Sequence, residues 1–172
     1  MNNEHQPLDA LSAQRHSLAH LLAAAVLELY PDAKPTLGPS IETGFYYDFA
    51  FSTPINEADL VKIENKMREL LPTWQTFERE AKSPAEAKKT FADNPYKLEL
   101  IEEISKNNEP ITFYRSGNFV DLCRGGHVNN MADIKTDSFK LDRLAGAYWR
   151  GDEKNIMLTR IYGLAFDKKE EL

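Results

Sequence analysis

The sequence predicts an α+β fold with a mostly antiparallel sheet and packed helices. In the first half of the chain, apolar residues recur mostly at helical spacing, whereas the part from residue 111 onward consists of short apolar and aromatic runs between Gly-rich turns. A length of 172 residues, 42% of them hydrophobic, is enough to bury a sizeable core without disulfide or metal staples. We therefore expect one main domain, with room for a smaller second subdomain from about residue 111.

The first predicted helix bears most directly on function. Ser12 is a suitable N-cap, and Pro31 ends the segment. One face of this helix carries leucines, while His16 and His20 lie one turn apart on the other face beside small and apolar residues. A helix that is apolar on both sides is typical of one covered by the core on one side and by a pocket on the other. We expect that pocket between the His-x-x-x-His helix and the sheet.

Three further helices are predicted, at residues 56–71, 83–92 and 96–105. Asn56 can cap the first of these, whose apolar residues then fall at helical spacing. Ser83 can cap the next, with Pro84 in the first helical position, where an N–H is not needed. The last helix ends at the polar run "KNNEP".

Strands are predicted from runs rich in apolar and aromatic residues, at residues 45–51, 76–80, 111–115, 119–122, 138–149 and 156–166. The first strand follows a loop punctuated by Gly and Pro. Within it, Tyr46 and Tyr47 point to opposite faces, so one of them is available to a pocket. Packing is the alternative role for either tyrosine.

Composition argues against several classes of protein. The net charge of −6 argues against a surface that grips nucleic acid by its phosphates alone, because such binding depends on excess Lys and Arg. A single cysteine excludes an internal disulfide, and the N-terminus has neither the basic region nor the long apolar stretch of a secretory signal. The longest apolar run, residues 18–30, is interrupted by His20 and Glu28 and is too short to span a bilayer. We expect a cytoplasmic protein with no membrane partner.

The rare side chains of the chain gather in two short windows. His16-x-x-x-His20 places two imidazoles on one face of a helix. The run "VDLCRGGH" holds Cys123 and His127 in a loop after a strand, and Asp121 points to the same face of that strand as Cys123. Two histidines from the first window with a cysteine and a histidine from the second are chemically suited to tetrahedral zinc.

Each of these residues also has an ordinary structural interpretation. A helical His pair is often structural, Cys123 can be a small buried hydrophobic residue, and the Arg-Gly-Gly run can be a tight turn. Asp121 can bond backbone amides beside a turn, or it can orient an imidazole or hold a substrate amine. Pattern alone favours a solvated position for Lys97 on its helix. The windows thus leave open a metal site, a catalytic pocket wall and a simple turn.

With these residues in view, the chain resembles the editing domain of bacterial-type threonyl-tRNA synthetases. Six segments carry the resemblance in the same order: "RHSLAHLLAAAV", "GPSIETGFYYDF", "YKLELI", "VDLCRGGHV", "LAGAYWRGD" and "RIYG". The resemblance implies an N-terminal extension at residues 1–14, the editing domain at 15–166 and the start of a truncated linker helix at 167–172. It also implies that this chain is a fragment without the ATP-dependent ligase domain.

The resemblance implies hydrolysis of the serine ester of mischarged Ser-tRNA specific for threonine. A second site is useful because serine lacks one methyl group, which gives only about 1–3 kcal/mol of discrimination. The family's editing residues correspond here to His16, His20, Lys97, Asp121, Cys123 and His127, with Tyr47 as a weaker match.

The resemblance also implies a role for each of these residues. His16 would position or deprotonate water, and Lys97 would assist by its charge and by proton donation. Asp121 would hold the serine amine or hydroxyl. Cys123 and His127 would shape the pocket.

The implied reaction requires no cofactor, but two alternatives stay open. Editing domains of alanyl-tRNA synthetases carry a similar His/Cys set and resemble zinc proteins, so a zinc-dependent hydrolase would use as ligands His16, His20, Cys123 and His127. The run "GFYYDF" in place of their glycine-glutamine-rich loop favours the threonyl branch. The second alternative is a non-catalytic module that binds the tRNA acceptor end.

The expected partners are a tRNA acceptor end carrying serine and the remaining synthetase domains. Phosphate contacts are expected from Arg124, Arg150, Lys154 and Arg160. Tyr148 or Trp149 could stack on a base.

Overall fold

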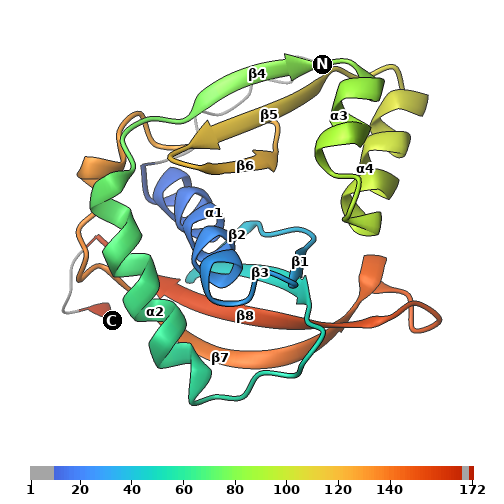
Figure 1. The fold of residues 1–172 in the computed structure, drawn as a ribbon. Helices are drawn as coiled ribbons and strands as arrows, with labels where there is room; N and C mark the ends of the chain where they lie inside the picture. The colour runs from blue at the N-terminus through green and yellow to red at the C-terminus, as the bar shows by residue number, and fades with distance from the viewer. Residues whose placement is uncertain (1–9, 168–170) are drawn as a thin grey trace, which may run out of the picture.

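The computed structural model describes residues 10–167 and 171–172 and confirms the α+β fold. In these residues, helix α1 (Ala10–Leu29) runs between two antiparallel sheets (Figure 1). The larger sheet follows the order β1-β3-β8-β7 with β2 paired to β3, and the smaller sheet follows the order β4-β5-β6. Helix α2 packs beside α1, while α3 and α4 lie side by side next to the smaller sheet (Figure 1).

The predicted helices and strands are present, with ends displaced by at most a few residues. The other helices are α2 (Asp59–Leu70), α3 (Pro84–Thr90) and α4 (Pro95–Lys106). The strands are β1 (Lys34–Pro35), β2 (Ser40–Ile41), β3 (Gly44–Ala50), β4 (Glu78–Lys82), β5 (Ile111–Ser116), β6 (Phe119–Leu122), β7 (Phe139–Tyr148) and β8 (Met157–Ala165). The two-residue strands β1 and β2 were not predicted, because a Pro/Gly-rich loop has no strand pattern of its own.

Helix α1 is buried on all sides between residues 17 and 26. This burial explains its sequence, in which small and apolar residues surround the helix, and each fully buried leucine contributes about 1.5–3 kcal/mol of transfer free energy. The prediction of Ser12 as N-cap was wrong, since the helix already includes Ala10 and Leu11, both good helix formers. No helix in the described part of the chain is long and apolar enough to cross a membrane.

The start of α4 is fixed by Asn94. Its Oδ1 accepts hydrogen bonds from the backbone N–H groups of Tyr96 and Lys97, both at 3.1 Å, which satisfies two of the free donors of the first turn. Its Nδ2 donates to the carbonyl oxygen of Pro35 at 2.7 Å. The cap therefore ties the first turn of α4, and Lys97 within it, to the strand that follows α1.

The sheets join segments from both sides of residue 111. Strand β4 pairs with β5, and β3 pairs with β8, so neither sheet has a break at the predicted subdomain boundary. Residues 10–14 of the predicted extension belong to α1. The rest of that extension, residues 1–9, and half of the predicted linker helix, residues 168–170, lie outside the described residues.

Candidate functional site

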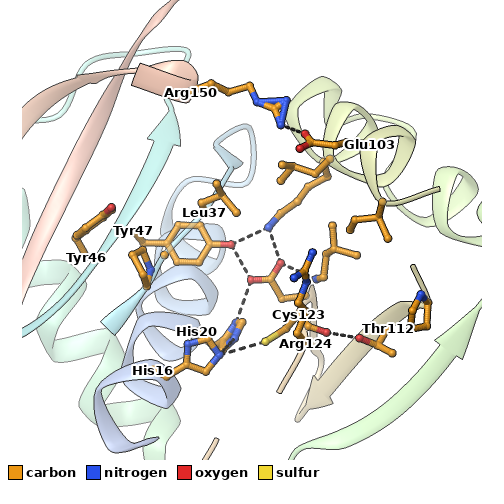
Figure 2. A pocket seen from close by; sticks show the side chains of 18 of the residues that line it. His16, His20, Leu37, Tyr46, Tyr47, Glu103, Thr112, Cys123, Arg124 and Arg150 are labelled. Carbon is orange, nitrogen blue, oxygen red and sulfur yellow. Dashed lines mark hydrogen bonds and ion pairs between the residues drawn. The ribbon is translucent and has the colours of Figure 1, made fainter. Parts of the chain in front are cut away.

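A cavity of about 410 Å³ opens beside the His-x-x-x-His helix. Its wall is formed by side chains from α1, the loop before β2, β3, α4 and β6 (Figure 2). Apolar residues make up one part of this wall, namely Leu37, Leu100, Ile104, Pro110 and Leu122. The polar part is built around Asp121, and it is connected by hydrogen bonds across four elements.

Asp121, near the end of β6, is the centre of the polar network. Its Oδ1 accepts from Lys97 Nζ at 2.6 Å and from the backbone N–H of Leu122 at 2.8 Å. Its Oδ2 accepts from the hydroxyl of Tyr47 at 2.6 Å and from Nδ1 of His20 at 3.0 Å. A carboxylate has about four lone-pair sites, and these four donors occupy them.

Lys97 is the largest departure from the sequence pattern. The pattern favoured a solvated lysine, but the residue is only 2% exposed. Its three N–H groups match three acceptors: Asp121 Oδ1, the carbonyl oxygen of Thr36 at 2.6 Å and the hydroxyl of Tyr47 at 3.0 Å. The buried ammonium is therefore both paired and fully hydrogen-bonded.

The charges of this network are set by burial and by neighbours. Burial acts to raise the pKa of Asp121, but the charge of Lys97 and the hydrogen bond from His20 hold it well below its usual value. Burial acts to lower the pKa of His20, but the hydrogen bonds and negative charges of Asp121 and Cys123 together outweigh it and raise the pKa from 6.5 to about 9. Burial and the Asp121 charge raise the pKa of Tyr47 well above its ordinary value, so its hydroxyl stays protonated.

Cys123 contacts histidines from both sequence windows. Its Sγ lies 3.1 Å from His16 Nε2 and 3.5 Å from His127 Nε2. The nitrogens Nε2 of His16 and His20 are 3.4 Å apart. Burial acts to raise the pKa of the Cys123 thiol, but hydrogen bonds with the three histidines lower it from 9.0 to about 4. At neutral pH this residue is therefore a thiolate in contact with imidazoles.

The loop after Cys123 is a turn as well as part of the site. Gly125 and Gly126 have φ angles of 112° and 97°, which residues with a side chain rarely adopt. A Cβ atom on Gly125 would lie 2.9 Å from the hydroxyl of Tyr114. The turn brings His127 back toward Cys123, where its ring stacks on Phe77 with centroids 4.1 Å apart.

We expect the free energy of unfolding, in metal-free protein, to change little between pH 6.5 and 9. The folded state keeps the proton on His20 and not on Cys123, whereas the unfolded chain does the reverse, so both states bind the same number of protons. Below pH 6.5 the unfolded state gains a proton on His20 that the folded state already holds, and stability falls toward pH 4.

The matched variant is Cys123→Ser, measured by urea denaturation from pH 5 to 9. Without the thiolate, the pKa of His20 rises less, but the part of the rise that Asp121 supplies is no longer offset by Cys123, so stability should fall as the pH rises above 6.5. A level profile for this variant would contradict the assignment of charges to the pair.

The Cys/His cluster could hold a metal ion. The four candidate ligand atoms, from His16, His20, Cys123 and His127, lie within 4.8 Å of one another. A tetrahedral zinc site with bonds of about 2.0–2.3 Å has ligand–ligand distances of about 3.3–3.8 Å, close to the three separations given above. The hydrogen bond from Nδ1 of His20 to Asp121 is the kind of outer contact that orients a metal-binding imidazole.

The arginines predicted to bind phosphate differ in their ion-pair partners and in their positions relative to the cavity. Arg160 makes a two-pronged contact with Asp48 of β3, at 2.8 and 3.0 Å, so its expected role in phosphate binding is not supported. Arg124 is exposed and pairs with Glu109 at 2.6 Å. Arg150 lines the cavity together with Arg124.

The two residues expected to stack on a base differ in their exposure to solvent. Trp149 is 6% exposed and donates its Nε1–H to Glu99 at 2.6 Å, so its ring is not available to a base. Tyr148 is 40% exposed and remains available. Lys154 lies in the exposed turn between β7 and β8.

The structure brings the predicted site residues into one network: His16, His20, Tyr47, Lys97, Asp121, Cys123 and His127. Sequence reasoning missed the carbonyl of Thr36 and the cap residue Asn94. A signal for Asn94 was present, because Asn followed by Pro is a common helix start. Nothing in the local sequence pointed to Thr36, which contributes a backbone atom.

Residues 111–162 match a family described as the threonyl and alanyl tRNA synthetase second additional domain. Among curated relatives, the threonine–tRNA ligases of Borrelia garinii subsp. bavariensis and Borreliella burgdorferi are each 52% identical over 164 residues, or 95% of this chain. That of Dehalococcoides mccartyi is 50% identical over 170 residues, or 99% of this chain. The chain spans 28% of the length of these relatives.

Proposed function

Because this chain contains the second additional domain of threonyl and alanyl tRNA synthetases, we propose that it hydrolyses the serine ester of mischarged Ser-tRNA specific for threonine. The observation that carries the proposal is the hydrogen-bonded network of His16, His20, Lys97 and Asp121 on the wall of the cavity. An ester is activated enough to be cleaved by water, so no covalent enzyme intermediate is required.

The proposed reaction begins with a water held by His16. The water oxygen attacks the ester carbonyl carbon while His16 takes its proton, and negative charge develops on the carbonyl oxygen. His20 is protonated at neutral pH because its pKa is about 9, and it supplies positive charge beside this oxygen. The bond to the ribose oxygen then breaks, and the proton on His16 passes to that oxygen.

Asp121 and Lys97 are proposed to act through neighbouring side chains and not on the substrate itself. The resemblance implies that Asp121 holds the serine amine or hydroxyl, but its four hydrogen bonds favour a role in orienting His20, Tyr47 and Lys97 instead. Lys97 has all three N–H groups engaged, so its proposed role is to keep Asp121 ionised rather than to donate a proton. Cys123 and Tyr47 then shape the space for the substrate side chain.

Serine release is the direct test of this proposal. Metal-free protein should release serine from Ser-tRNA specific for threonine faster than threonine from the matching Thr-tRNA. Equal rates would contradict the proposed selectivity. Tight binding of both tRNAs without any release would favour a non-catalytic module that binds the acceptor end.

A zinc-dependent hydrolase is the second candidate, and the spacing of the four ligand atoms is the observation that favours it. His16, His20, Cys123 and His127 would hold the ion, and the outer hydrogen bond from His20 to Asp121 would orient one of its imidazoles. Bound zinc would supply Lewis-acid activation of water or of the ester carbonyl.

We expect Co²⁺, used as a spectroscopic substitute for zinc, to bind chelator-treated protein with one equivalent. Contact with the Cys123 thiolate should give a sulfur-to-metal absorption band, and the Cys123→Ser variant should lack it. The Ser116→Ala variant, which changes a buried hydroxyl away from the cluster, should keep the band. No saturable spectral change in the wild-type protein would remove the metal candidate.

A further inference from the structure

Arg150 and Glu103 meet at the open side of the cavity. Arg150 lies in the turn between β7 and β8, Glu103 lies on α4, and both side chains line the cavity (Figure 2). The Arg150 guanidinium contacts a carboxylate oxygen of Glu103 and lies 3.5 Å from one of Glu99. The Arg150 side chain is 32% exposed and that of Glu103 is 52% exposed, so solvent and ligands can reach this pair.

The direction of Arg150 is built into the turn. Its φ angle of 58° is uncommon for a residue with a side chain, which indicates that the surroundings select this conformation. Next to it, the buried Trp149 donates to Glu99 at 2.6 Å and fastens the turn to α4. The turn is thus held by Trp149 and Glu99, while Glu103 neutralises the arginine that faces the cavity.

We propose that Glu103 masks the charge of Arg150 until a phosphate group of an RNA 3′ end enters the cavity and replaces the carboxylate. The inference rests on the proposed function, because that function brings a ribose–phosphate chain to this opening. Carboxylate and phosphate fit the same planar fork of arginine donors, so one can replace the other without moving Arg150.

Masking also gives selectivity to an acidic chain. With a net charge of −6 and a carboxylate on its anchoring arginine, the protein repels polyanions in general. An RNA end that fills the cavity gains enough other contacts to displace Glu103, whereas a nonspecific polyanion does not. The carboxylate therefore acts as a specificity-determining group.

The Glu103→Gln variant tests the proposal, since it keeps the size of the side chain and removes its charge. The test ligand is an RNA hairpin with a single-stranded 3′ end that carries no amino acid. Its affinity, measured by fluorescence anisotropy, should increase about three- to fivefold. The slope of log affinity against log salt should become steeper by about 0.7, because the Glu103 carboxylate that is displaced in the wild type takes up a cation, which offsets the one released by the bound phosphate.

The matched control is Glu102→Gln. Glu102 is the neighbour of Glu103 on α4 and pairs with Lys88 at 2.8 Å, and it is not part of the cavity wall, so the variant changes the net charge equally. Its affinity for the hairpin should stay near the wild-type value. In the Arg150→Met background, the Glu103→Gln change should have no effect, because the charge it unmasks is absent.

Three results would overturn the proposal. Glu102→Gln and Glu103→Gln could raise the affinity for the hairpin equally, or Glu103→Gln could raise it in the Arg150→Met background. The third is that no variant binds the hairpin at low salt. The hairpin carries no amino acid, so these results do not depend on hydrolysis. Loss of serine release with the expected binding pattern would contradict the proposed function and leave the masking of Arg150 supported.

Discussion

Replacing Asp121 by asparagine should reduce serine release at least about 100-fold and lower the free energy of unfolding by about 3–5 kcal/mol. The asparagine fits the same space, but it leaves the ammonium of Lys97 buried without a counter-charge, at 2% exposure. It also removes the acceptor that keeps His20 protonated. Urea denaturation and serine release, both at pH 7, measure the two effects.

Two further variants separate charge from packing. Asp142→Asn removes an exposed carboxylate paired with Arg143 on β7, and its stability should stay within about 0.5 kcal/mol of the wild type. The Asp121→Leu, Lys97→Met double variant replaces the buried pair by apolar groups, so it should recover much of the stability but none of the activity. If Asp121→Asn were as stable as Asp142→Asn, the buried ion pair would have no energetic role.

Replacing His16 by alanine should lower kcat for serine release by about 10²–10⁴-fold, which is the usual contribution of a positioned general base. His16 lines the cavity and is only partly buried, so the change should affect KM and folding much less than it affects kcat. Steady-state release of serine from charged tRNA, with thermal denaturation alongside, gives the comparison.

Glu28→Ala is the control on the same helix, because Glu28 is exposed near the C-terminal end of α1 and does not line this cavity. It should leave kcat unchanged. An unchanged kcat for His16→Ala would assign the handling of water to another group. A large rise in KM at constant kcat would instead make His16 a substrate-binding residue.

Local pattern was sufficient where contacts are local. The helical positions of His16 and His20 follow from a spacing of four residues, and the predicted cap Ser83 is confirmed, since its hydroxyl accepts from the backbone N–H of Glu86. Strand alternation correctly separated Tyr47, whose hydroxyl reaches Asp121, from Tyr46, which packs against Arg160, but the expectation that one of them faces the pocket was wrong because both line the cavity. These predictions depend on periodicity, which a linear sequence displays.

Local pattern failed where the partner lies far along the chain. Lys97 looked solvated because its acceptor at Thr36 is 61 residues away and is a backbone carbonyl. Arg160 looked available to phosphate because its partner Asp48 lies 112 residues away on β3. No periodicity encodes such pairings, since they depend on which strands and helices the fold brings side by side.

The sequence by itself determines the α+β class and the two short windows of histidine, cysteine and aspartate, because composition and spacing are local properties. Only the tertiary structure decides that His16 meets Cys123 across 107 residues and that Lys97 is buried against Asp121. The physical reason is that α1 lies between two sheets. The low exposure there makes each buried charge require a partner, and the same burial sets the charges of the site.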